Sequence, residues 1–217
     1  MNQNSNGVRG NTVALLRKLA RSKSGQEQCD FCNAALPPDH RHLLEVSSTK
    51  IICACDACAL RFEGVIGRYK LIPRDPRRLE NFRMSDEQWE SLALPIHLAF
   101  FFHSTPAKRT VAMYPSPAGA MESLLPLENW RALEQENPEL SRMEPDVEAL
   151  LLNRLGSERL YCIAPIDQCY ELAGLLRLHW RGLSGGEVVW QKIREFFTKL
   201  RTQAGIAEEP EALATNA

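Results

Sequence analysis

The cysteines of this chain are concentrated in one short stretch. Five of the seven lie between residues 29 and 58, as a Cys29-x-x-Cys32 pair followed by Cys53, Cys55 and Cys58. A two-residue spacer lets a tight turn direct both sulfurs of a pair towards one point, and four thiolates at about 2.3 Å complete a tetrahedron around a zinc-sized ion. The spacing therefore predicts one metal site with four ligands: Cys29, Cys32, Cys55 and Cys58.

Two alternatives remain open for the ligands. Cys53 precedes Cys55 by two residues, so both would point to one face of an extended segment, and Cys53 is the alternative third ligand. His40 and His42 lie on the intervening segment, where they either supply a ligand or face solvent beside the Pro-Pro-Asp turn at 37–39.

Zinc is the predicted ion and iron is the alternative. Two Cys-x-x-Cys pairs suit either metal. Rubredoxin-like iron sites usually carry a glycine directly after the second cysteine of a pair, whereas this chain has Asn33 and Ala59 at those positions. The reading of these cysteines as unligated core residues is disfavoured by their clustering, although cysteine is often buried.

The segment between the cysteine groups should form a hairpin that brings them together. Apolar residues at 43–46 and 50–52 predict two strands joined by a turn at 47–49. The first part of the chain is then expected to contain a flexible N-terminus with a short amphipathic helix (1–25), a zinc-ribbon-like metal-binding module with four cysteine ligands (26–66) and a linker rich in proline and charge (67–84).

Two capping boxes predict helix starts in the remainder of the chain. Ser85 with Gln88 marks the first, and Ser184 with Glu187 marks the start of the last helix, which carries a broad apolar stripe. Between them the chain resembles itself at an offset of 50, as in Pro95 with Pro145 and Trp130 with Trp180. Fixed-offset similarity is typical of an internal duplication.

Each copy reads as strand, turn, strand and helix. The expected strands are 96–103 and 109–114 in the first copy and 147–154 and 159–164 in the second, with helices near 126–136 and 168–180. The predicted fold class is α+β, in which the small four-cysteine module is followed by a duplicated ββα domain with a largely antiparallel sheet. This domain should span 85–203, with repeats at about 91–133 and 141–183 and a C-terminal helix, before a disordered tail over 204–217.

The remaining reactive residues do not assemble a recognisable catalytic motif. The loop Tyr114–Ala120 reads either as an anion-binding turn or as a rigid strand-to-helix connection. His97 and His103 flank an apolar strand, and Cys169 and His179 lie nearly three turns apart on one expected helix, too far apart to touch. Cys162 reads, like Cys169, as a core residue. The sequence therefore favours a non-enzymatic role and leaves an enzyme open.

Composition describes a globular chain whose charge is divided unevenly. It has 217 residues, 44% of them hydrophobic, and a net charge of −1. Residues 1–83 carry 14 Lys and Arg against 8 Asp and Glu, a net of +6, which permits contact with nucleic acid or an acidic protein. No apolar run is long enough for a membrane span, and residues 1–23 lack the features of a secretory signal, so we expect a cytoplasmic protein without disulfides.

Several segments together resemble a known family. They are Cys29–Leu44, Ile52–Leu60, Leu98–Phe102, Tyr114–Ala120, Glu144–Leu151 and Cys169–Leu175. Over residues 26–203 the chain resembles an uncharacterised bacterial family of unknown function, DUF5947. The resemblance implies a genomic context beside nickel–iron hydrogenase genes of high-affinity type, and it assigns no role to any residue.

Three functions follow as hypotheses. The first is a non-enzymatic, zinc-binding accessory or adaptor protein, whose partner the resemblance implies to be a hydrogenase subunit or maturation factor. The second is a rubredoxin-like electron carrier that holds iron between four cysteines. The third is a zinc-ribbon regulator that binds nucleic acid, although neither a recognition helix nor an aromatic stacking platform is evident.

Overall fold

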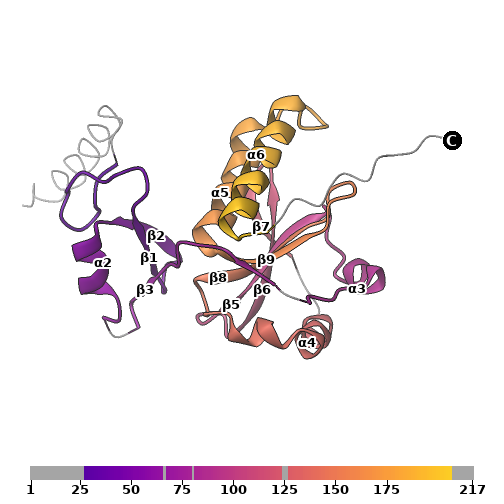
Figure 1. The fold of residues 1–217 in the computed structure, drawn as a ribbon, viewed down its shortest axis with the longest axis horizontal. Helices are drawn as coiled ribbons and strands as arrows, with labels where there is room; N and C mark the ends of the chain where they lie inside the picture. The colour runs from indigo at the N-terminus through magenta and orange to yellow at the C-terminus, as the bar shows by residue number, and fades with distance from the viewer. Residues whose placement is uncertain (1–26, 66, 80, 124–126, 207–217) are drawn as a thin grey trace, which may run out of the picture. The chain divides into compact units, whose positions relative to one another are not determined.

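The computed structural model describes residues 27–206 except 66, 80 and 124–126, and the expected N-terminal helix and most of the expected tail lie outside these residues. The chain divides into two compact units, Met1–Leu71 and Ile72–Ala217, which we call the first and second unit. Figure 1 shows the elements of both units.

The first unit is a three-stranded antiparallel sheet with one short helix. Its elements are β1 (Arg41–Glu45), β2 (Lys50–Ala54), α2 (Asp56–Phe62) and β3 (Tyr69–Leu71), and the strand order is β2-β1-β3. β1 and β2 confirm the predicted hairpin, whereas α2 was not predicted. A small core contains Leu43, Ile52 and Tyr69 together with the cysteine Cys29, so the cysteine region is part of the packing of this unit.

The segment 67–84, expected to be a linker, contributes a strand to each unit. β3 pairs with β1, and β4 (Arg77–Arg78) pairs with the edge of the second sheet. Ile72 and Leu79 are buried. Pro73 and Pro76 cannot donate to a ladder, so the segment supplies only short edge strands.

The second unit is built on a six-stranded antiparallel sheet in the order β4-β9-β8-β5-β6-β7. Its strands after β4 are β5 (Leu98–Ser104), β6 (Arg109–Ser116), β7 (Gly119–Ser123), β8 (Glu148–Asn153) and β9 (Leu160–Pro165). Its helices are α3 (Asp86–Ser91), α4 (Leu127–Glu136), the 3-10 helix η1 (Pro138–Arg142), α5 (Ile166–His179) and α6 (Glu187–Gln203).

Helices cover both faces of this sheet (Figure 1). On one face Trp130 of α4 belongs to the same core as Phe101, and their rings stack with centroids 5.4 Å apart. On the other face Tyr170 of α5 contacts Phe100, the neighbour of Phe101 on β5. Since adjacent residues of a strand point to opposite faces, α4 and α5 lie on opposite sides of the sheet.

The predicted ββα duplication is not confirmed. Residues 50 apart occupy equivalent places within their own hairpins, because Phe101 pairs with Ala112 and Leu151 pairs with Cys162. Across the central strands, however, Phe101 pairs with Leu150, and directly paired residues share a face. Residues 50 apart therefore point to opposite faces of the sheet. The rotation that superposes the two hairpins would instead leave matched residues on the same face. β7, between β6 and α4, also has no counterpart between β9 and α5.

The two predicted capping boxes have different outcomes. The box at Ser85 is confirmed, with the Gln88 backbone N–H donating to the Ser85 hydroxyl and the Gln88 side chain accepting from the Ser85 N–H. The box at Ser184 is wrong, because α6 begins at Glu187 after the N-cap Gly186, without a side-chain cap. Gly185 has φ +86°, and a Cβ there would lie 2.9 Å from a methyl carbon of Val189. Ser184 could cap the helix only if the helix began directly after that residue. The glycine turn instead places the start of the helix further along the chain.

We expect the Ser85→Ala substitution to lower the free energy of unfolding of the second unit by about 1 kcal/mol, because it removes the acceptor for the Gln88 N–H. Denaturant titration checks this value. The exposed Ser157, replaced by alanine in the same way, serves as the control and should change stability by less than about 0.5 kcal/mol. Equal effects of the two substitutions would contradict a stabilising cap.

None of the helices within the described residues combines the length and the apolar character needed to cross a bilayer.

Candidate metal centre

The first cysteine pair sits on a tight turn. The Asn33 N–H donates to the Cys29 carbonyl at 2.8 Å, and the Cys29 N–H donates to the Ala34 carbonyl at 2.8 Å. Asn33 adopts φ +60°, a left-handed conformation that asparagine tolerates better than most residues. A metal-binding knuckle can therefore form without a glycine after Cys32. The absence of glycine at this position is then no longer an argument against iron.

The second pair lies at the start of a helix. Cys55 is the N-cap of α2, and Cys58 lies in its first turn, so a spacing of three residues places both side chains on one side of the helix. The hairpin of β1 and β2 lies between the two pairs and carries none of these four cysteines. The expected zinc-ribbon identity is not confirmed, because a zinc ribbon would carry the second pair on another knuckle.

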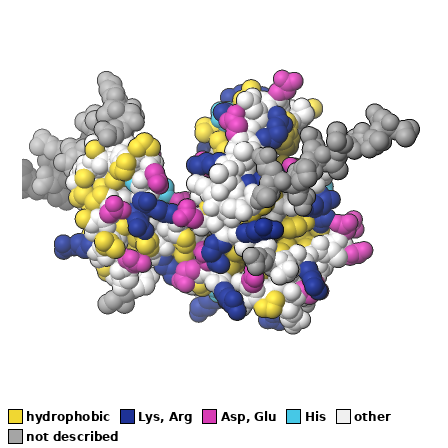
Figure 2. Space-filling model, viewed as in Figure 1, with side chains coloured by type: hydrophobic (Ala, Val, Ile, Leu, Met, Phe, Trp, Pro, Cys, Tyr) yellow, Lys and Arg dark blue, Asp and Glu magenta, His cyan; other side chains and the backbone are white. Residues whose placement is uncertain are grey.

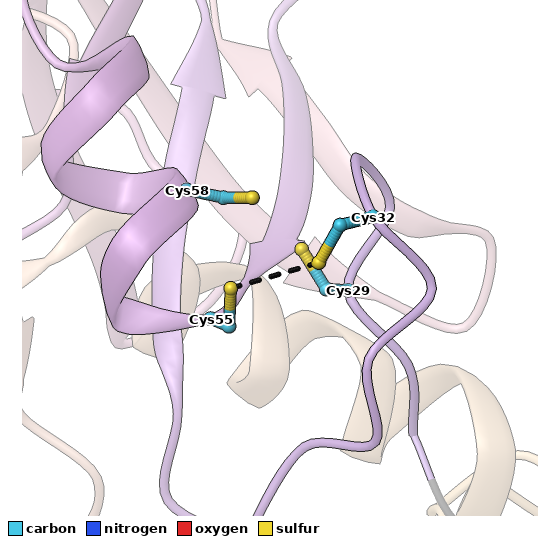
Figure 3. Close-up of side chains that lie close together, drawn as sticks. All are labelled: Cys29, Cys32, Cys55 and Cys58. Carbon is cyan, nitrogen blue, oxygen red and sulfur yellow. Dashed lines mark hydrogen bonds between the residues drawn. The ribbon is translucent and has the colours of Figure 1, made fainter.

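The four sulfurs converge on one point (Figure 3). The sulfurs of Cys29, Cys32, Cys55 and Cys58, which we call the four-cysteine cluster, all lie within 4.8 Å of one another. The Cys32 and Cys55 sulfurs are 3.7 Å apart, close to the separation of about 3.8 Å that a tetrahedral ion with 2.3 Å bonds imposes. A disulfide would need about 2.05 Å, and all seven cysteines are free. The cluster could hold a metal ion.

The electrostatics of the cluster also favour a cation. Burial of Cys29 opposes its ionisation, but the backbone N–H groups of Cys55, Cys32 and Phe31 donate to its sulfur and lower its pKa to about 6. Burial, followed by the neighbouring sulfurs of Cys55, Cys32 and Cys29, raises the pKa of Cys58 to about 12. The first thiolate therefore forms readily, and its negative charge opposes ionisation of the next thiol. A divalent cation bound by the sulfurs would offset this repulsion.

Cys53 lies outside the four-cysteine cluster. It is on β2, and Cys55, the N-cap of α2, still has the extended backbone that was expected. Of these two cysteines, only Cys55 has its sulfur among the four that converge. The backbone of Cys53 instead anchors the first knuckle. Its N–H donates to the Asp30 carboxylate at 2.9 Å, and its carbonyl accepts from the Asp30 N–H at 2.9 Å. Asp30 was not singled out in the sequence, where only its place inside the first pair marks it.

The other candidate residues take structural places. His97 pairs with the Trp89 indole N–H at 3.2 Å, and His103 is exposed on β5. Cys162 and Cys169 are buried, and burial raises the pKa of both thiols, that of Cys162 to about 12. Such thiols behave as inert core residues.

The loop at 114–120 is a hairpin turn, so the second of its two readings, a strand-to-helix connection, is wrong. β6 runs to Ser116 and β7 begins at Gly119. The Ser116 hydroxyl donates to the Gly119 carbonyl at 2.9 Å and accepts from the Ala118 N–H at 3.1 Å. Since Ser116 already engages the Ala118 amide, the turn offers little to an anion.

An open cavity of about 580 Å³ in the second unit was not predicted. Arg154, whose side chain is buried in its wall, pairs with Asp86, and its guanidinium carbon lies 5.3 Å from the centroid of the Trp89 ring. Among the described residues, the lining of this cavity contains no serine, threonine, cysteine or lysine side chain.

Comparison with known proteins places the chain in a family. No curated protein and no solved structure matches the chain. The sequence profile of a family of unknown function matches residues 28–204, which is most of the chain. The chain therefore belongs to the DUF5947 family.

Proposed function

We propose that this protein is a non-enzymatic accessory or adaptor protein whose first unit is organised by a zinc ion bound to the four-cysteine cluster. The convergence of four sulfurs within 4.8 Å is the observation that carries this proposal. A site with four protein ligands leaves no position for a substrate, which is the arrangement of structural zinc. Because Cys29 is itself a core residue of the first unit, binding the ion and packing the unit are one event.

The hydrogenase link rests on the family resemblance. We propose that the partner is a hydrogenase subunit or a maturation factor for that enzyme. Apolar side chains exposed on the first unit support a protein partner: Leu60 of α2 is 71% exposed and Val65 is 43% exposed. Burial of such residues is a common source of binding energy in protein interfaces.

An iron-bound electron carrier is the second candidate. Its support is the left-handed Asn33, which permits the knuckle geometry, and the exposure of Cys32, which brings the cluster to the surface. Colour separates the two candidates, because iron bound by four thiolates absorbs visible light and zinc does not.

Nucleic acid is the less favoured partner. Arg41 pairs with Asp56 at 3.3 Å, and Arg68 pairs with Glu45 at 3.0 Å, so two of the basic residues of the first unit are partly neutralised. On the face seen in Figure 2, basic and acidic side chains of this unit are interspersed. A single basic stripe would suit a phosphate backbone better.

Affinity purification of the tagged chain from its own host, with elemental analysis, tests the proposal. We expect a colourless protein that contains zinc, and we expect the Cys32→Ser variant to contain about one zinc fewer per chain. A hydrogenase subunit or maturation factor should be recovered with the wild type and lost with Leu60→Asp. The control Val188→Asp alters an exposed residue of the second unit and should retain the partner.

Three results would contradict parts of this proposal. Protein purified without bound metal would end the assignment of the four-cysteine cluster as a metal site. A red protein with iron would favour electron transfer. Partner recovery that is equal for Leu60→Asp and the wild type would exclude the apolar surface of α2 from docking.

A further inference from the structure

Three side chains outside the four-cysteine cluster also converge. His42 on β1 pairs directly with Cys53 on β2, and His40 lies two residues before His42. Residues two apart on an extended segment share a face, as do directly paired residues, so the hairpin register gathers all three. A nitrogen of each histidine and the sulfur of Cys53 lie within 4.8 Å of one another. This face is the one opposite the core residues Leu43 and Ile52.

The hydrogen bonds of His40 orient one ring nitrogen towards this point. Its Nδ1 lies 2.9 Å from the Pro37 carbonyl oxygen, which can only accept, so Nδ1 carries the proton. In the neutral ring Nε2 then has the free lone pair, and it faces His42. A histidine that donates its other N–H to a backbone carbonyl is the usual arrangement of a metal ligand. The ring of His40 is buried, which holds it in this orientation.

The separation of the two histidines fits a shared cation. Their Nε2 atoms are 3.1 Å apart, and a tetrahedral ion with 2.0–2.1 Å bonds would separate them by about 3.3 Å. A hydrogen bond between the rings gives a similar distance. That hydrogen bond, however, does not explain why a thiol lies at the same point, whereas a metal site would use this thiol as its third ligand.

The ligand set defines the class of ion. Two imidazoles and one thiolate suit the borderline divalent transition metals, such as zinc, cobalt and nickel. Three protein ligands leave a fourth position open, and His42 and Cys53 are only half-buried. We propose that His40, His42 and Cys53 form a second site for a divalent transition metal, with one position open to water or to an external ligand. This site uses none of the four sulfurs of the four-cysteine cluster.

Cobalt titration of the full-length chain tests the second site. Protein carrying zinc in the four-cysteine cluster is titrated with Co²⁺, which reports four-coordinate geometry and sulfur ligation by its visible and near-ultraviolet absorption. We expect one further equivalent to bind with a sulfur-to-cobalt band from a single thiolate. His42→Ala and Cys53→Ser should weaken this binding by more than about 100-fold and leave the first zinc in place. The exposed His103→Ala on β5 should bind cobalt as the wild type does.

A separate variant guards against loss of folding. His42→Asn keeps a polar side chain of similar reach, and hydrogen exchange of β1 and β2 reports whether each variant retains the hairpin. A folded His42→Asn protein that binds cobalt as tightly as the wild type would overturn the second site. A wild-type chain that holds zinc in the four-cysteine cluster but takes up no cobalt would also overturn the second site. Loss of that first zinc alone would count only against the four-cysteine cluster as a metal site.

Discussion

Replacing Cys29 with serine is expected to unfold the first unit and to leave the second unit folded. Cys29 is fully buried, and its sulfur belongs both to the four-cysteine cluster and to the small apolar core. A structural zinc site contributes on the order of 10 kcal/mol to folding, more than a core of this size supplies. The second unit has a separate and larger core, so it does not depend on the ion.

Hydrogen exchange measured by mass spectrometry checks this expectation. Amides in residues 27–71 should lose protection in Cys29→Ser, and in the wild type treated with a strong chelator, while amides in residues 72–206 keep theirs. Cys53→Ser is the matched comparison, because it changes a cysteine of the same unit outside the four-cysteine cluster, and the amides of the first unit should stay protected in this variant. A first unit that remains protected in Cys29→Ser would show that its packing does not need the ion.

The second large effect is expected in the core of the second unit. Phe101→Ala and Trp130→Ala should each lower the free energy of unfolding by about 3–5 kcal/mol, because both side chains are almost fully buried. Their rings stack, so the double variant should reveal a coupling energy of about 0.5–1.5 kcal/mol. Denaturant titration of the single and double variants measures both quantities.

A second double-mutant cycle tests which face each helix covers. Leu172 is fully buried on α5, across the sheet from Phe101, and its effect should add to that of Phe101→Ala within about 0.5 kcal/mol. The exposed Leu178 on the same helix provides a control with a small effect when replaced by alanine. Strong coupling of Phe101 to Leu172, without coupling to Trp130, would contradict the placement of α4 and α5 on opposite faces.

The cysteine region could be predicted to the level of its ligand types but not of its full geometry. The Cys-x-x-Cys spacings identified the four sulfurs that converge, because a short spacer restricts where two side chains can point. The helix α2 was missed, since its seven residues, which follow Cys55 and include Cys58, carry little helical periodicity. The choice between Cys53 and Cys55 could not be made from local spacing, because both lie on extended backbone and only the folded unit brings the Cys55 sulfur to the other three.

The second unit shows the same division between local and long-range information. The strands of both central hairpins lie close to their predicted positions because apolar runs and turn residues mark them locally. The apparent duplication was not confirmed, because residues 50 apart lie on opposite faces of the sheet. Sequence similarity at a fixed offset does not reveal the register in which two strands pair. A register shift of one residue moves every side chain of a strand to the other face of the sheet.

Amino-acid order alone was enough to predict an antiparallel α+β protein with a four-cysteine cluster, because spacing and periodicity are properties of neighbouring residues. The folded chain was needed to bring His40, His42 and Cys53 together and to put α4 and α5 on opposite sides of one sheet. Both features depend on strand register and on packing between segments distant in sequence, where each contact is settled jointly with many others.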